Sequence, residues 1–263
     1  MRLNSSCMTV SKIAELLEEN EVPLHIITML HNDTRVTVVR LLQRWKQRQN
    51  NMQCEQERIQ KLYTHERGFT AEGFKRIVGV DEAGRGPLAG PVVIGAVILP
   101  LGYHLPLLND SKKLSAKQRQ TLYYAIKEVA IATSHAIITV DRIDQDNIYQ
   151  ATVAGMYQAI SKLQPQPDMA LIDAVPLPDL TIPACPLIGG DAISASIAAA
   201  SIIAKVERDN IMQELNQQFP MYGFAKHKGY GTAEHLLAIQ KYGPCPIHRR
   251  SFEPIKSWGC TSL

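Results

Sequence analysis

The spacing of apolar residues changes near Arg76, and this change constrains the fold more than any other feature. From Val10 to about Tyr63, apolar residues recur every three to four positions, which is typical of amphipathic helices. After Arg76 the apolar runs are short, β-branched and separated by helical stretches, as in an α/β layer architecture. The sequence therefore predicts a small N-terminal helical module with a linker in residues 1–70, followed by one α/β domain in residues 71–263.

Within the module, the polar side chains of Asn32-Asp33-Thr34 can cap a basic helix from Arg35 to Arg48. Its arginines and lysines form either a solvated face or a surface that contacts nucleic acid, and the two interpretations have equal weight. The polar stretch Gln47 to Glu57, followed by Glu66-Arg67-Gly68, is interpreted as a linker.

In the α/β domain, Ile77 to Asp81 and Val92 to Leu99 are predicted to form an antiparallel strand pair joined by a Gly- and Pro-rich turn. Further strands are expected at 135–140 and 169–172, and helices at 114–132, 147–163, 193–219 and 233–242. Asp144 or Asp146 should cap the second of these helices. The alanines and serine at 198–201 should let the third lie close against the sheet.

The densest chemical signal follows the first strand, where the adjacent carboxylates Asp81 and Glu82 lead into Gly84-Arg85-Gly86. Neighbouring strand residues point to opposite faces, so the two acids share a site only where the strand ends or bends. Gly84 and Gly86 permit a bend and a close backbone approach to a ligand. The alternative is a charged strand end before a turn, but a turn rarely needs two acids, an arginine and two glycines.

Asp173 and Asp191 are candidates for the same site. Asp173 ends the strand at 169–172, at the sheet edge where ligands of α/β proteins usually bind. Taken alone, it is equally well a turn residue before Pro176. Asp191 precedes the Ala- and Ser-rich helix, so it is either a site residue or an N-cap, a role that Ser194 could also fill.

These acids form a set of oxygen ligands without His or Cys, which favours Mg²⁺ or Mn²⁺. Two such ions about 3.5–4 Å apart can activate a water and stabilise the leaving oxygen of a phosphodiester displacement. A second acidic run, Asp141, Asp144 and Asp146, lacks the glycine and the distal glutamate of a calcium loop and is interpreted as loop and cap.

Composition sets wider limits. With 263 residues, of which 45% are hydrophobic and 20% charged, the chain can bury a substantial core, and its net charge of +3 permits nucleic-acid binding without requiring it. Its five scattered cysteines, never spaced Cys-x-x-Cys, argue against disulfides and structural zinc. No signal peptide or membrane span is expected, so we expect a cytoplasmic protein, and a monomer because no heptad run demands association.

Several segments, in this order, resemble the ribonuclease HII family (type 2 ribonuclease H) over about Arg76 to Trp258. They are Asp81-Glu82-Ala83-Gly84-Arg85-Gly86-Pro87-Leu88-Ala89-Gly90, Asn109-Asp110-Ser111-Lys112-Lys113-Leu114, Leu171-Ile172-Asp173, Gly190-Asp191-Ala192, Ala198 to Arg208, Lys228-Gly229-Tyr230-Gly231 and His248-Arg249-Arg250-Ser251-Phe252. The resemblance implies a ribonuclease H-like fold: a mixed central sheet flanked by helices, with a C-terminal helical region that binds substrate.

By the same resemblance, Asp81, Glu82, Asp173 and Asp191 correspond to the acids of a two-metal site holding Mg²⁺ or Mn²⁺. Gly84, Arg85 and Gly86 correspond to a loop that contacts the 2′-hydroxyl of a ribonucleotide, the group that distinguishes RNA from DNA. Tyr230 corresponds to a tyrosine beside the junction between ribonucleotide and deoxyribonucleotide. Without the resemblance, we would interpret it as an aromatic residue in a Gly-rich turn.

The basic segments are expected to hold phosphates, although any one of these side chains is equally a solvated charge. They comprise Ser111, Lys112, Lys113, Lys226, Lys228, Arg249 and Arg250. The implied activity is cleavage 5′ of ribonucleotides in RNA–DNA hybrids and in duplex DNA. The alternatives are a ribonuclease HIII-like or other ribonuclease H-like nuclease and, in a different class, a catalytically silent hybrid-binding protein.

Overall fold

The computed structural model describes residues 8–19 and 22–259, and the chain divides into two compact units, residues 1–58 and 59–263. The first unit contains α1 (Val10–Glu18), α2 (Leu24–His31) and most of α3 (Val36–Leu62). Its small core is formed by Ile13, Leu17, Ile27, Leu30, Val38 and Leu42. A carboxylate oxygen of Asp33 accepts a hydrogen bond from the Arg35 amide at 2.9 Å, so the predicted polar start of this helix is confirmed.

The stretch Gln47 to Glu57, interpreted above as a linker, is helical and forms the middle of α3. It contains no glycine or proline, and side chains four positions apart are paired. The Gln47 amide donates to Asn51 at 2.8 Å and the Gln53 amide donates to Glu57 at 3.0 Å. The segment Glu66-Arg67-Gly68 is also helical, within α4 (Thr64–Ala71). The high polarity of these residues reflects a helix that is exposed to solvent.

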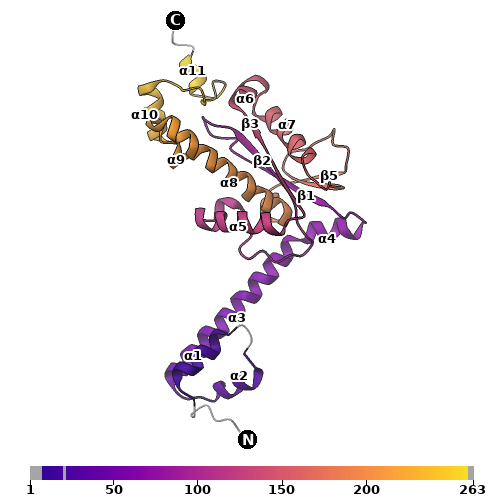
Figure 1. Cartoon of the computed structure of the whole chain (residues 1–263), viewed down its shortest axis with the longest axis vertical. Helices are drawn as coiled ribbons and strands as arrows, with labels where there is room; N and C mark the ends of the chain where they lie inside the picture. Colours follow the sequence, from indigo (N-terminus) through magenta and orange to yellow (C-terminus); the bar gives the residue numbers. More distant parts are fainter. Residues whose placement is uncertain (1–7, 20–21, 260–263) are drawn as a thin grey trace. The chain divides into compact units, whose positions relative to one another are not determined.

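The second unit is built on a mixed five-stranded sheet with the order β3-β2-β1-β4-β5 (Figure 1). Its strands are β1 (Ile77–Ala83), β2 (Val92–Ile98), β3 (Ala132–Ile138), β4 (Met169–Asp173) and β5 (Ala184–Leu187). The first three pair antiparallel, whereas β4 pairs parallel with both β1 and β5. The predicted α/β architecture is confirmed. The third strand begins three residues earlier than predicted, and the four-residue β5 was not predicted.

Helices cover both faces of this sheet (Figure 1). The even-numbered residues of β2 pack with α7 (Ile148–Ser161), and Val97 packs with α5 (Ala116–Val129) and α8 (Ala195–Gln218). A side chain at Gly79 or Gly95 would collide with the α8 backbone, at Ser196 and Ala200 respectively. The close approach of this Ala- and Ser-rich helix to the sheet is confirmed.

The connections around α7 correct two predictions. Asn147 itself caps α7, its side chain accepting from the Tyr149 amide at 3.0 Å and from the Gln150 amide at 3.1 Å. Asp144 and Asp146 belong instead to the short helix α6 (Val140–Asp146), which replaces the expected acidic loop. The Asp144 carboxylate accepts from the backbone amides of Arg250 and Ser251, at 2.8 and 3.0 Å, and so anchors a segment near the C-terminus.

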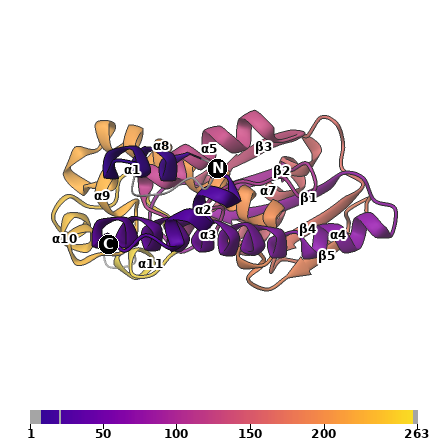
Figure 2. The same cartoon turned by 90° about the horizontal axis from the view of Figure 1, so that it is seen from below.

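The C-terminal part of this unit contains α9 (Phe224–His227), α10 (Ala233–Tyr242) and α11 (Ile255–Gly259). Figure 2 shows these helices gathered at one end of the unit, opposite β5 and α4. They surround a core that includes Met212, Tyr222 and Phe224. In the described part of the chain, no helix is both long and apolar enough to cross a membrane.

Candidate active site

The ends of β1 and β4 bring the first acids together. These strands are parallel neighbours with Val80 opposite Ile172, so Asp81 and Asp173 follow at the same sheet edge. Strand β1 continues to Ala83 alongside β2, but its pairing with β4 ends at Val80. Asp81 and Glu82 therefore lie beside the end of β4. Asp81 is only 4% exposed.

Asp191 reaches the same edge from a short 3₁₀ turn, Gly190–Ala192. The Gly190 amide donates to a carboxylate oxygen of Asp173 at 2.8 Å, which ties this turn to the end of β4. Ser194 caps α8 by accepting from the Ile197 amide, so Asp191 is not the cap. Its carboxylate lies 3.4 Å from the Lys112 ammonium.

The four predicted acids share one electrostatic neighbourhood. Burial raises the pKa of Asp81 well above its ordinary value, and the charges of Glu82 and Asp173 raise it further. Burial also raises the pKa of Glu82, against the opposing charge of Arg85 at 3.4 Å. The pKa of Asp191 is raised by burial and then by the charge of Asp110, a carboxylate that was not among the four predicted acids.

These carboxylates fit a hard divalent cation. Each supplies oxygen donors, and Oε2 of Glu82 is buried without a hydrogen-bond partner. Among the described residues, no three His, Cys, Asp or Glu side chains are already gathered around one point that would hold a metal ion. The donor set and the unpartnered oxygen therefore support metal binding at this edge.

Two buried arginines hold the backbone of the segment at 84–91, which includes the Gly-Arg-Gly loop. Arg249 is fully buried and donates to the carbonyl oxygens of Gly84 at 2.6 Å, Arg85 at 2.8 Å and Gly90 at 2.8 Å. Arg208 donates to the carbonyls of Ala89 and Pro91, at 3.2 and 3.0 Å. Burial lowers the pKa of Arg249 to about 9, which leaves the guanidinium charged at neutral pH. The Arg249 side chain is enclosed and bonded to backbone, which favours a positioning role over the phosphate contact predicted from the sequence.

Tyr230 lies beside this loop. A side chain added at Gly86 would come within 3.8 Å of the Tyr230 ring, whose exposed fraction is 49%. Gly229 packs its backbone against the Ala89 carbonyl with a φ of +86°, and the Leu88 amide donates to the Gly229 carbonyl at 2.9 Å. The segment at 228–231 is thus fastened to the loop that carries Gly84 to Gly86.

The other basic-segment residues differ in their surroundings. Ser111 is buried, with its hydroxyl 2.8 Å from that of Ser201 on α8. Lys112 and Lys113 are exposed, and Lys112 faces Asp191. Lys226 pairs with Glu234 at 2.6 Å and not with any of the four predicted site acids. Burial lowers the pKa of Lys228, which is partly exposed beside Tyr230.

Glu66, which no sequence pattern marked as a site residue, is 3% exposed. Its Oε1 accepts from the Ser194 hydroxyl at 2.7 Å and from the Ser196 amide at 2.9 Å, so a residue of α4 holds the N-terminus of α8 next to Asp191. The polar local sequence gave no sign of this burial, because the partners lie about 130 residues away.

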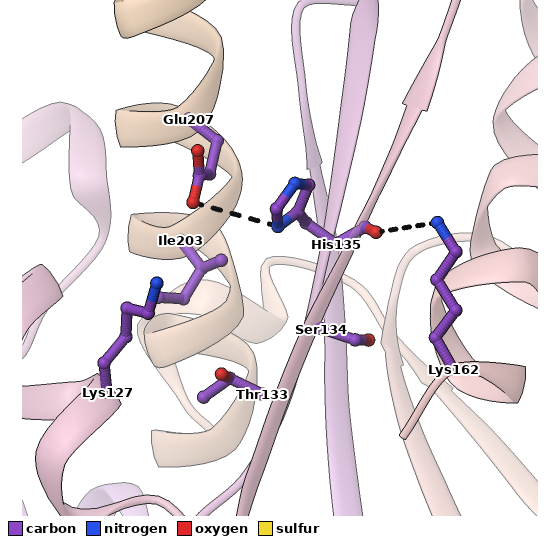
Figure 3. A pocket seen from close by; sticks show the side chains of 7 residues that line it. All are labelled: Lys127, Thr133, Ser134, His135, Lys162, Ile203 and Glu207. Atoms are coloured by element: carbon purple, nitrogen blue, oxygen red, sulfur yellow. Dashed lines mark hydrogen bonds and ion pairs between the residues drawn. The ribbon is translucent and has the colours of Figure 1, made fainter. Parts of the chain in front are cut away.

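A cavity of about 410 Å³ lies elsewhere, at the edge strand β3 (Figure 3). Its lining includes His135, whose ring nitrogen is 3.8 Å from Glu207, and Lys162, which donates to the His135 carbonyl at 3.3 Å. None of the predicted site residues lines it. The carboxylates at the ends of β1 and β4 are not part of this cavity.

Comparisons with known proteins agree with this geometry. The Ribonuclease HII family model matches residues 78–255, and the Ribonuclease HII N-terminal domain matches residues 9–70. A Ribonuclease HII from Pelotomaculum thermopropionicum is 46% identical over 97% of each chain, and one from Geobacillus thermodenitrificans is 49% identical over 87% of this chain and 88% of its own. The ribonuclease H2 structure from Pyrococcus horikoshii covers 70% of this chain and 96% of its own, at 25% identity and a TM-score of 0.59. The structure of Bst-RNase HIII in complex with Mn²⁺ shares the fold at 17% identity, covers 70% of this chain and 69% of its own, and has a TM-score of 0.51.

Proposed function

Because this chain belongs to the ribonuclease HII family of endoribonucleases, we propose that it hydrolyses the phosphodiester bond 5′ of ribonucleotides. The substrates are RNA–DNA hybrids and single ribonucleotides embedded in duplex DNA, and the products carry a 3′-hydroxyl and a 5′-phosphate. The observation that carries this proposal is the acid-lined end of β1 and β4, continuous with a glycine loop that packs beside Tyr230.

The family and its fold indicate a divalent-metal nuclease that binds nucleic acid. We propose Mg²⁺ or Mn²⁺, with two ions held by Asp81, Glu82, Asp173 and Asp191 in the substrate complex. Bound ions supply an activated water and charge stabilisation for the leaving oxygen. The protein keeps the acids at one edge through the β1–β4 register and the Gly190 hydrogen bond.

Substrate recognition is assigned to the neighbouring loop. The backbone of Gly84 to Gly86 approaches the ribose 2′-hydroxyl, and the exposed Tyr230 ring packs against the sugar at the junction. Arg249 is a positioning residue for this loop, because its guanidinium binds the carbonyls of Gly84 and Arg85. Arg208 positions the segment that follows the loop, through the carbonyls of Ala89 and Pro91. The exposed Lys112 and Lys113 and the partly exposed Lys228 hold phosphates without reading sequence.

The N-terminal module is proposed to aid substrate binding. Arg40, Arg44 and Lys46 are exposed on α3, and Arg40 and Arg44 lie one helical turn apart. Such charges increase affinity for a phosphate backbone without sequence preference.

Deletion of residues 1–58 tests this role. A cut near Phe69, at the end of the expected module, would remove Ile59 and Tyr63 from the catalytic core as well as Glu66. The shorter deletion preserves them, so we expect KM to rise by about threefold to tenfold at low salt with kcat maintained. Charge neutralisation of Arg40 and Arg44 in the full chain is the matched control, and an unchanged KM in both variants would remove the proposed role.

The central experiment uses an end-labelled DNA duplex with one ribonucleotide, incubated with Mg²⁺, Mn²⁺ or chelator, beside Asp81→Asn. We expect a metal-dependent cut immediately 5′ of the ribonucleotide that the variant does not make. An all-DNA duplex of the same sequence tests for a broader ribonuclease H-like nuclease. Metal-enhanced binding without turnover would instead indicate a silent hybrid-binding protein.

A further inference from the structure

Three buried histidines lie behind the Tyr230 segment. His227 ends α9, His235 lies in α10, and His248 immediately precedes the buried Arg249. Their exposed fractions are 9%, 0% and 1%. The rings of His227 and His235 stack with centroids 4.4 Å apart, and Phe224 packs against all three rings. Nothing in the proposed chemistry uses these side chains directly.

The hydrogen bonds of His248 and His235 have defined donors and acceptors. The Cys245 amide must donate, so Nδ1 of His248, 2.9 Å away, accepts, although the Cys245 carbonyl lies 3.3 Å from the same nitrogen. Nε2 of His248 then carries the proton and donates to Nε2 of His235 at 3.0 Å. Nδ1 of His235 in turn donates to the Tyr230 carbonyl at 2.9 Å.

A second chain reaches the same segment through His227. Its Nδ1 accepts from the Gly229 amide at 3.2 Å, and its Nε2 donates to the Tyr222 carbonyl at 2.7 Å. Each ring is therefore neutral with one defined tautomer, assigned from the direction of the backbone partners. Burial favours the same state, since it lowers the pKa of His235 and lowers that of His248 to about 4.

We propose that His227, His235 and His248 form a neutral imidazole relay that positions Tyr230 for ribonucleotide recognition. The relay binds the backbone on both sides of Tyr230, through the Gly229 amide and the Tyr230 carbonyl, and connects it to the segment that carries Arg249. The histidines are positioning residues that act through the tyrosine. This inference rests on the role proposed above for Tyr230.

Two variants of His235 test the hydrogen bonds of its two ring nitrogens separately. In His235→Asn, the side-chain amide nitrogen occupies the Nδ1 position and retains the bond to the Tyr230 carbonyl, but the contact with His248 is lost. In His235→Gln, the amide reaches His248, but the bond to Tyr230 is lost. Both variants delete one buried hydrogen bond, so their thermal stabilities should be similar. His135→Gln, on β3, controls for a general effect of a His-to-Gln change.

We expect His235→Gln to lower kcat/KM at a single embedded ribonucleotide by about fivefold to tenfold, and His235→Asn to lower it by less than about twofold. Cleavage of a long RNA–DNA hybrid should fall less in His235→Gln. Such a hybrid contains many ribonucleotides, and the enzyme can bind and cut at any of them. In a Tyr230→Ala background, His235→Gln should add no further loss. Equal losses by both His235 variants on both substrates, or additive losses with Tyr230→Ala, would overturn the relay.

Amide hydrogen exchange gives a readout that does not depend on turnover. The Thr232 amide donates to the same Tyr230 carbonyl at 2.8 Å. Its exchange should accelerate about tenfold in His235→Gln and little in His235→Asn. If the wild-type protein failed to cut the ribonucleotide duplex while exchange responded in this way, the recognition role of Tyr230 would fail and the relay would stand as a structural device. Equal exchange in the two variants would refute the relay whatever the activity.

Discussion

Arg208 and Arg249 are buried as deeply as Asp81, with exposed fractions of 1%, 0% and 4%, but their charges are satisfied differently. Each guanidinium donates to backbone carbonyls of the segment at 84–91, whereas Glu82 beside Asp81 has a buried oxygen without a partner. The arginine charges therefore hold the loop and do not neutralise the acids. Lys112 and Arg85 offset only part of that negative charge, which favours a divalent cation at the acids.

The largest expected effect comes from neutralising one acid. Asp81→Asn should lower the cleavage rate by about 10³-fold or more, because the site loses a charge that holds the metal ions. Without divalent metal, the same change should raise the free energy of unfolding by about 1 kcal/mol, since it removes a desolvated charge from like charges. Rate measurements and urea unfolding in chelator test both parts, and a variant less stable than wild type would contradict the comparison.

Removing a buried arginine should have the opposite effect on stability. Arg249→Met leaves the carbonyls of Gly84 and Arg85 without this donor, at a cost of about 3 kcal/mol. Urea unfolding in chelator measures the loss. The exposed neighbour Arg250 provides the matched control, Arg250→Met, which should change the free energy of unfolding by less than about 0.5 kcal/mol. Equal stability of the two variants would show that the loop does not depend on the guanidinium.

This comparison also shows what could be predicted from the sequence. Apolar periodicity located most strands and helices, and the position of Asp81 and Asp173 after apolar strands predicted one shared edge, which the β1–β4 register provides. Helix ends and the short β5 were harder to predict from the sequence. Caps such as Asn147 depend on local backbone geometry, and a strand of four residues has little periodicity.

Long-range pairing limited the prediction of individual roles. Arg249 looked like a phosphate ligand because the sequence shows its charge but not its acceptors, which lie 159–165 residues away. Glu66 looked like part of a linker for the same reason. Polarity predicts exposure on average, but it fails where a distant backbone supplies the hydrogen bonds.

The pH dependence of stability tests the comparison between the buried acids and the buried arginines. The folded pKa values of Asp81 and Glu82 are raised, so the native state binds more protons than the unfolded chain above about pH 4. Their contribution to stability is therefore present at low pH and is lost as pH rises through the folded pKa values. In chelator, we expect the free energy of unfolding to decrease more steeply with rising pH in the wild type than in Asp81→Asn. Saturating Mn²⁺ should reduce this dependence, and an identical pH slope in the variant would count against the coupling.

The smallest effect is expected at Glu66, a buried carboxylate whose Oε1 accepts from a hydroxyl and a backbone amide and whose Oε2 has no hydrogen-bond partner. Glu66→Ala removes the acceptor for Ser194 and Ser196 and should cost about 1 kcal/mol. Glu66→Gln retains an acceptor oxygen and should cost less, but it should not stabilise the metal-free protein as Asp81→Asn does. Thermal unfolding in chelator compares the three variants. A stabilising Glu66→Gln would mean that this carboxylate, too, lacks adequate compensation, and that burial rather than clustering dominates the energetics of the acids.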